Sequence, residues 1–135
     1  MSPLIDIYED GHVHTRLCNH AVGEMAEYVA MAVERGLARI VFLEHLETEI
    51  AYQPPSWLGE EEFSFYFREG TRLQERFQGV IDIQLGVELG FNPAATDLIR
   101  QRLARYPFDR VGVSCHFYRH GDVHLNLLSR RRQSL

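Results

Sequence analysis

Two histidines, His12 and His14, follow an apolar run near the start of the chain, and His20 comes soon after them. Residues two apart in an extended segment point to the same face, so the imidazoles of His12 and His14 would be aimed the same way. Two adjacent half-buried imidazoles that served only the fold would each need a polar partner. The spacing therefore indicates a pair of metal ligands at the end of a strand.

The chain has 135 residues, which is typical of one domain with a hydrophobic core of its own. Its formal net charge is −5 at pH 7. Non-specific binding to nucleic acid or to anionic membranes needs a basic surface, so we expect neither as a partner. All 14 basic residues are Arg and none is Lys, which excludes a lysine Schiff base and a phosphate-binding lysine of the P-loop type.

The cysteines and the N-terminus indicate in which cellular compartment the protein is expected. Cys18 and Cys115 fit no paired metal-binding pattern and make no disulfide framework. The N-terminus has no basic segment followed by a long apolar stretch, which predicts no signal peptide. No window approaches the ~18 apolar residues of a membrane span. We therefore expect a cytoplasmic protein.

Hydrophobic periodicity predicts strands and helices in alternation. The predicted strands are 4–8, 39–43, 81–87 and 111–115, and the predicted helices are 23–35, 60–77 and 92–105. Gly36 stands where a C-terminal cap is expected after the first helix, and Pro107 ends the third. The segment 48–59 is expected to be a loop, and 125–135 to begin a further helix. This order favours a parallel sheet with right-handed crossovers.

Each predicted strand leads, at its carboxyl end, into a residue that can bind a metal ion. In chain order these are His12 and His14, His45, Glu88 and His116. The carboxyl ends of the strands form the functional face of parallel α/β folds and barrels. Any one of these residues could be a loop histidine, a buried histidine or a surface carboxylate. All four strand ends together are difficult to explain by chance, so we expect the side chains to meet at one rim of the sheet.

With these residues in order, the chain resembles the PHP (polymerase and histidinol phosphatase) family of metallophosphoesterases, and most closely its histidinol-phosphatase-like members. Five segments between Asp10 and His116 carry the resemblance: 10–15 (DGHVHT), 17–21 (LCNHA), 42–46 (FLEHL), 85–88 (LGVE) and 113–117 (VSCHF). The resemblance implies an α/β fold, a partial distorted (βα) barrel with about four parallel strands and flanking helices. Residues 1–135 would be the N-terminal portion of a PHP domain, an incomplete barrel.

The resemblance also implies a ligand set for divalent metal ions. His12 and His14 would hold a first ion. Glu88 would bridge it to a second ion, which His116 also binds. The family binds Zn, Mn or Fe at such sites, and imidazole with carboxylate does not discriminate sharply among these metals.

Four further residues receive roles from the same resemblance or from their position. His20 and His45 would serve a third ion. Asp10 would orient a ligating imidazole through a hydrogen bond, as carboxylates commonly do beside metal-bound histidines. Arg16 lies near the site in the sequence and could contact a phosphate, although a solvated surface position is its plainer interpretation.

The function implied is a metal-dependent phosphomonoester hydrolase of histidinol-phosphatase type, in which a di- or trinuclear metal site activates water against a small phosphorylated substrate. The alternative is a truncated, catalytically inactive metal-binding module, because later ligands of the family have no clear counterpart after His116. Hydrolysis of an amide or cyclic substrate is a third, weaker option. A half barrel leaves strand edges unpaired, so we expect either a fragment of a longer protein or a homodimer that covers the open side.

Overall fold

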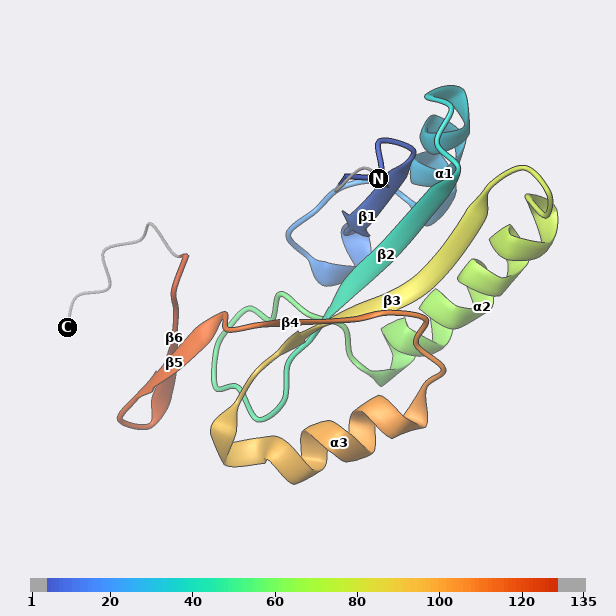
Figure 1. Ribbon diagram of the computed structural model, residues 1–135. Helices are drawn as coiled ribbons and strands as arrows, with labels where there is room; N and C mark the ends of the chain where they lie inside the picture. Colours follow the sequence, from blue (N-terminus) through green and yellow to red (C-terminus); the bar gives the residue numbers. More distant parts are fainter. Residues whose placement is uncertain (1–4, 129–135) are drawn as a thin grey trace.

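The structure is a computed structural model, and it describes residues 5–128. Four parallel strands form one sheet in the order β1–β2–β3–β4, with bounds Glu9–Val13, Arg39–Leu46, Asp82–Gly90 and Val111–Ser114. Three helices connect them in turn (Figure 1), namely α1 (Met25–Glu34), α2 (Glu60–Arg76) and α3 (Thr96–Arg105). The single-turn helices η1 (Arg16–Cys18) and η2 (Pro93–Ala95) precede α1 and α3. The predicted α/β class and the four parallel strands are confirmed.

The core lies between the sheet and the helices α1 and α2, which pack against the strands and against each other. Tyr66 of α2 is fully buried, and its hydroxyl donates to the carbonyl oxygens of Gly86 at 2.8 Å and of Phe42 at 3.3 Å. Gly70 of α2 faces Leu85, whose side chain would lie 2.5 Å from a Cβ atom at position 70. The absence of a side chain at Gly70 therefore lets α2 approach β3 closely.

The predicted first strand, 4–8, is wrong for the described residues 5–8. These residues form a turn in which the backbone N–H of Tyr8 donates to Oδ1 of Asp6 at 2.9 Å. Such a side-chain acceptor competes with the strand ladder for the backbone donor. Strand β1 therefore begins at Glu9, so His12 lies within it and His14 directly follows it.

Strands β2 and β3 both continue past their predicted ends. Strand β2 ends at Leu46 and β3 ends at Gly90, three residues beyond the ends of the apolar runs. The backbone ladder does not depend on side-chain polarity, so it continues through His45 and Glu88. These two residues are partners in the parallel register and their side chains therefore point to the same face.

An antiparallel hairpin follows β4 and was not predicted. It consists of β5 (Phe117–His120) and β6 (Val123–Asn126). The predicted helix over 125–135 is therefore wrong where it can be judged, because 125–126 are strand and 127–128 are turn; positions 129–135 lie outside the described residues. The turn at Gly121, with φ of 60°, allows the chain to reverse.

The hairpin docks on the loop between β2 and α2. Phe117 is buried, and its ring centroid lies 5.0 Å from that of Tyr52 and 5.8 Å from that of Trp57. The backbone N–H of Ala51 donates to Nδ1 of His124 at 2.9 Å, and the backbone N–H of His124 donates to the carbonyl oxygen of Ala51 at 3.0 Å. The hairpin thus stands beside the carboxyl ends of the strands (Figure 1).

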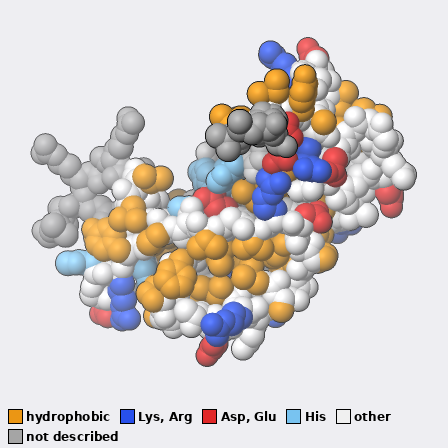
Figure 2. All heavy atoms as spheres, viewed as in Figure 1, with side chains coloured by type: hydrophobic (Ala, Val, Ile, Leu, Met, Phe, Trp, Pro, Cys, Tyr) orange, Lys and Arg blue, Asp and Glu red, His pale blue; other side chains and the backbone are white. Residues whose placement is uncertain are grey.

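The described chain leaves one side of the sheet open. Strands β1 and β4 are its outer strands, and Val111 and Val113 of β4 are 46% and 67% exposed. Figure 2 shows hydrophobic side chains gathered around β4 and the hairpin on this face. The homodimer that would cover such a surface stays a prediction. No helix in residues 5–128 is both long and apolar enough to cross a membrane.

Candidate metal centre

A cavity of about 400 Å³ opens at the carboxyl ends of the parallel strands. The six side chains that the sequence suggested as metal ligands all line it: His12, His14, His20, His45, Glu88 and His116. His12, His45 and Glu88 lie within strands β1, β2 and β3. The other three lie in the segments that follow β1 and β4. The structure therefore brings together residues from four successive strand–helix units, while their role as ligands stays a prediction.

Glu88 lies at the centre of the histidines. Its Oε2 atom is 2.9 Å from Nε2 of His12, 3.1 Å from Nε2 of His14 and 3.6 Å from Nδ1 of His45. Its Oε1 atom is 3.1 Å from Nε2 of His116. Strand β3 lies between β2 and β4, so histidines from both sides of this strand approach the carboxylate of Glu88.

Two groups of three potential ligand atoms share Glu88. In each group the atoms lie within 4.8 Å of one another, and the groups are His12, His14, Glu88 and His45, Glu88, His116. Two adjacent groups with a common carboxylate have the form of a bridged pair of metal positions. Divalent transition metals accept this combination of imidazole and carboxylate.

A third group within the same distance consists of His14, Cys18 and His20. Cys18 is fully buried, its Sγ atom donates to the carbonyl oxygen of Thr15 at 3.1 Å, and burial raises the pKa of its thiol. A thiol that stays protonated is a poor ligand. The ring of His20 instead packs edge-on against His45, with 4.5 Å between centroids.

Unpaired buried nitrogen atoms test whether the site fits a metal ion. Nδ1 of His14 and both ring nitrogens of His45 are buried and make no hydrogen bond among the described residues. Burial lowers the pKa of His14 to about 4 and of His45 to about 3, so both rings are neutral at pH 7. Each buried unpaired group costs about 1–3 kcal/mol. A neutral imidazole with a free lone pair is what a metal ion binds, so these residues fit one.

The charge on Glu88 is maintained by its neighbours. Burial alone would raise its pKa, but the hydrogen bonds from His12 and Ser114 and the nearby His45 outweigh burial and bring the pKa to about 2. The hydroxyl of Ser114 donates to Oε1 at 2.8 Å. Ser114 was not predicted, because a lone serine at the end of a strand carries no distinctive signal.

Glu44 positions the chain that carries His14. It faces the opposite side of β2 from His45, where it is fully buried. Its Oε1 atom accepts hydrogen bonds from the backbone N–H of Thr15 at 2.8 Å and from the Thr15 hydroxyl at 2.5 Å. Burial raises the pKa of Glu44 to about 7. Because Thr15 directly follows His14, this contact fixes the backbone position of His14 just after the end of β1.

Glu47 also lines the cavity and was missed by the sequence analysis. It is 4% exposed, and its Oε1 atom lies 2.5 Å from Nδ1 of His116. This hydrogen bond raises the pKa of His116. The signal was present in the sequence, because Glu47 follows His45 by two residues, the same spacing that separates His12 from His14.

Asp10 and Arg16 are not among the residues that line the cavity. The carboxylate of Asp10 accepts a long hydrogen bond, 3.5 Å, from the backbone N–H of His12 and none from an imidazole among the described residues. The guanidinium of Arg16 pairs with Glu24, and its side chain is 51% exposed. Neither side chain therefore makes the contact that the sequence analysis suggested, and both roles stay predictions.

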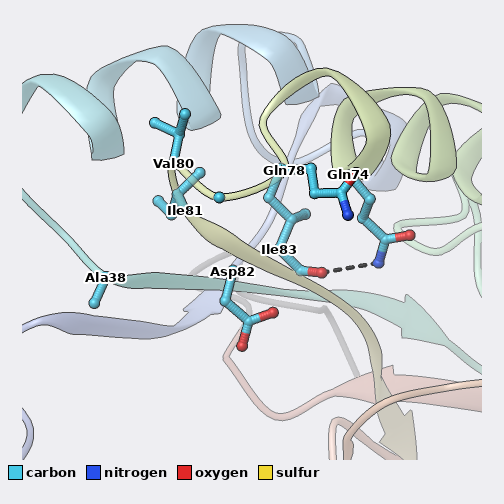
Figure 3. Close-up of a pocket in the computed structure, with 8 residues that line it drawn as sticks. Ala38, Gln74, Gln78, Val80, Ile81, Asp82 and Ile83 are labelled. Carbon is cyan, nitrogen blue, oxygen red and sulfur yellow. Dashed lines mark hydrogen bonds between the residues drawn. The ribbon is translucent and has the colours of Figure 1, made fainter.

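A larger cavity, of about 570 Å³, lies at the opposite end of the sheet, between the end of α2 and the start of β3 (Figure 3). The amide of Gln74 donates to the carbonyl oxygen of Ile83 at 2.8 Å across it. Among residues 5–128, Asp82 is the only ionisable residue that lines it, and its carboxylate pairs with Arg39. Size alone therefore does not identify the candidate site, because the smaller cavity is the one lined by five histidines and Glu88.

The chain belongs to the PHP domain family, whose family model matches residues 10–134. The match covers every side chain that surrounds Glu88. It also agrees with the predicted family resemblance, which is thereby confirmed.

Relatives and solved structures match this chain over part of their own length. A relative from Deinococcus radiodurans, named "Probable histidinol-phosphatase", is 32% identical over 80% of this chain and 42% of its own. The crystal structure of histidinol phosphate phosphatase from Lactococcus lactis, complexed with Zn, L-histidinol and phosphate, is 29% identical with a TM-score of 0.73, over 84% of this chain and 41% of that one. A crystal structure from Listeria monocytogenes, 20% identical with a TM-score of 0.80 over 90% of this chain and 50% of that one, shows the same fold. This chain spans half or less of the length of these proteins.

Proposed function

We propose that this chain supplies the metal-binding part of a metal-dependent phosphomonoester hydrolase of histidinol-phosphatase type. The observation that carries the proposal is the position of the Glu88 carboxylate among four imidazoles at the carboxyl ends of parallel strands. The relatives support it, because one is named for this activity and a solved structure holds Zn, L-histidinol and phosphate.

The proposed ligand set follows the two groups that share Glu88. His12 and His14 hold one divalent ion with Glu88, and His116 and Glu88 hold a second. His45 belongs to the second group as well, and its ring stacks on that of His14 with 4.3 Å between centroids. The Lactococcus structure favours Zn, and the donor set suits Mn or Fe as well.

His20 and His45 would serve a third ion. Ring contacts bring the two together, and His20 also lies 5.4 Å from His14 between centroids. The number of ions in the working site is part of the proposal.

When bound, divalent ions would supply positive charge for the phosphate oxygens and a water molecule of lowered pKa. The residues of this chain prepare the site for them. Glu88 stays ionised and offsets the positive charge, while His14 and His45 stay neutral and keep their lone pairs available. The cavity of about 400 Å³ is large enough for a small phosphorylated molecule, and Phe117 provides an apolar wall.

The test is metal content and phosphate release in parallel. We expect the purified protein to retain Zn or Mn and to hydrolyse a generic phosphomonoester such as p-nitrophenyl phosphate. His12→Ala should lower both at least about tenfold. Arg100→Ala is the control, because Arg100 is 79% exposed on α3, away from the cavity. If His12→Ala releases phosphate as fast as the wild type does, the proposal is contradicted.

The same measurements separate the alternatives. Retained metal with no release of phosphate would favour the catalytically inactive metal-binding module. Release from an amide or cyclic ester in preference to a phosphomonoester would favour the third option. Histidinol phosphate is the substrate to compare with the generic ester, since histidinol and phosphate occupy the Lactococcus structure.

A further inference from the structure

We propose that Glu47 positions His116 for metal binding, the role that the sequence analysis gave to Asp10. The inference rests on the proposed metal site. Oε1 of Glu47 lies 2.5 Å from Nδ1 of His116, while Nε2 of the same ring points to Oε1 of Glu88 at 3.1 Å. One ring nitrogen of His116 therefore faces a carboxylate outside the two ligand groups, and the other faces the shared carboxylate inside them.

This arrangement selects one tautomer of His116. A carboxylate accepts a hydrogen bond, and of the two carboxylates that face the ring Glu47 is the closer, at 2.5 Å against 3.1 Å for Glu88, so we place the proton of the neutral ring on Nδ1. Nε2 is then left with its lone pair toward the cavity. A carboxylate in this position fixes the orientation of a metal-binding imidazole and makes it a stronger base.

Contacts to the backbone of Glu47 and Thr48, and the space left by Gly90, fix the position of the Glu47 side chain. Nη1 of Arg102, on α3, donates to the backbone carbonyl oxygen of Glu47 at 2.6 Å and to the hydroxyl of Thr48 at 3.1 Å. The side-chain amide of Asn92 donates to the carbonyl oxygen of Thr48 at 2.9 Å. A Cβ atom at Gly90 would lie 1.8 Å from Oε2 of Glu47, so the glycine leaves the space that the carboxylate occupies.

Two observations distinguish Glu47 from a ligand and from Asp10. Among the described residues, its carboxylate belongs to none of the three groups whose ligand atoms lie within 4.8 Å of one another. Asp10 is exposed and contacts only the backbone of His12 among these residues. A positioning carboxylate has to be buried against a ring nitrogen, and Glu47 meets that requirement.

The experiment compares Glu47→Ala and Glu47→Gln with the wild-type protein in Zn titrations against a competing chelator. We expect Glu47→Ala to bind the same number of Zn ions with about 10–100-fold weaker affinity for one of them. Glu47→Gln keeps the size and an acceptor oxygen but loses the charge, so its affinity should fall in between. Glu49→Gln is the matched control, since Glu49 is exposed two residues away and should bind Zn as the wild type does.

A second readout is independent of metal and of turnover. In metal-free protein at alkaline pH, ¹H–¹⁵N NMR should show the proton of His116 on Nδ1 in the wild type, and a shift toward the other tautomer in Glu47→Ala. Circular dichroism checks that each variant is folded. If Glu47→Ala proves unfolded, Glu47→Gln decides the matter through the same two readouts.

The outcomes are distinct. Unchanged Zn affinity and an unchanged tautomer overturn the positioning role, and so does the loss of one whole Zn equivalent, which would make Glu47 a ligand. A wild-type protein that binds no Zn removes the proposed metal site and this inference together. Zn binding that depends on Glu47 without any phosphatase activity supports the inference while contradicting the proposed function.

Discussion

Nε2 of His12 lies 2.9 Å from Oε2 of Glu88, although 76 positions separate the two residues in the chain. Their strands are not neighbours, because β2 lies between β1 and β3. The two side chains meet because parallel strands have their carboxyl ends at one edge of the sheet and β1 has a register shift between Asp10 and Val13. A strand irregularity of this kind commonly re-aims a side chain.

Replacing Glu88 should remove the common point of both ligand groups. We expect Glu88→Gln to lose at least one metal equivalent and to lower any phosphate release about 100-fold or more, because a neutral amide cannot replace a bridging carboxylate. Metal analysis of purified protein measures this directly. Asp82→Asn, at the other end of the same strand, is the control and should keep its full metal content. Equal metal content in Glu88→Gln and wild type would contradict the prediction.

Removing the metal should lower thermal stability. A ligand at about 100 times its Kd stabilises the native state by about 2.7 kcal/mol, which for a domain of this size corresponds to roughly 5–15 °C in Tm. We therefore expect EDTA-treated protein to melt at a lower temperature than the same protein with added Zn, in a calorimetric or thermal-shift measurement. The difference should disappear in Glu88→Gln. Identical midpoints with and without Zn in the wild type would show that the site holds no Zn.

Gly70→Ala should destabilise the protein even though alanine is the better helix former. Alanine in place of glycine stabilises a helix interior by about 1 kcal/mol. The new Cβ, however, would lie 2.5 Å from the side chain of Leu85, and overpacking a core costs about 1–3 kcal/mol. We expect a net loss of about 1 kcal/mol in urea unfolding. Ser64→Ala, on the exposed side of the same helix, should be neutral or slightly stabilising. A more stable Gly70→Ala would mean that α2 and β3 can separate without cost.

The ion pairs of Glu9 should give a stability contribution that depends on pH. The carboxylate of Glu9 accepts hydrogen bonds from Arg110 and Arg39, and these lower its pKa. Burial acts in the opposite direction but is outweighed, so the pKa of Glu9 lies below its ordinary value of 4.5. A lowered pKa in the folded state stabilises the protein above the unfolded pKa, and this contribution is lost as pH falls through the folded pKa. Glu9→Gln should therefore be less stable than wild type by about 1 kcal/mol at pH 7, with a smaller difference below pH 4.5.

Urea unfolding of Glu9→Gln and wild type at neutral and acidic pH measures this effect. Asp97→Asn serves as the control because the Asp97–Arg100 pair is largely solvent-exposed, with side chains 88% and 79% accessible. It should match the wild type at every pH. A stability difference for Glu9→Gln that grows as the pH falls would have the wrong sign and would contradict the ion-pair explanation.

The local pattern of the sequence was sufficient for most of the elements. The helix predicted over 60–77 is observed at Glu60–Arg76, and the strand predicted over 111–115 at Val111–Ser114. Hydrophobic periodicity reports which face of an element is buried, and that information is local. The periodicity gave a wrong prediction at residues 5–8, where the side chain of Asp6 accepts a hydrogen bond from the backbone N–H of Tyr8. It also missed the hairpin, where Phe117 packs on a distant loop.

The alternation of strands and helices, the family resemblance and six of the side chains that meet at one rim could be predicted from the sequence alone. Hydrophobic periodicity and short motifs carry this information, because both depend on residues that are close together in the chain. Which atoms meet could be seen only in the folded chain: Glu88 is the centre, and Glu47 rather than Asp10 contacts an imidazole ring. Such contacts depend on the register between strands, on a glycine that leaves space, and on a helix that fixes a loop. Each of these joins residues that are far apart in the chain.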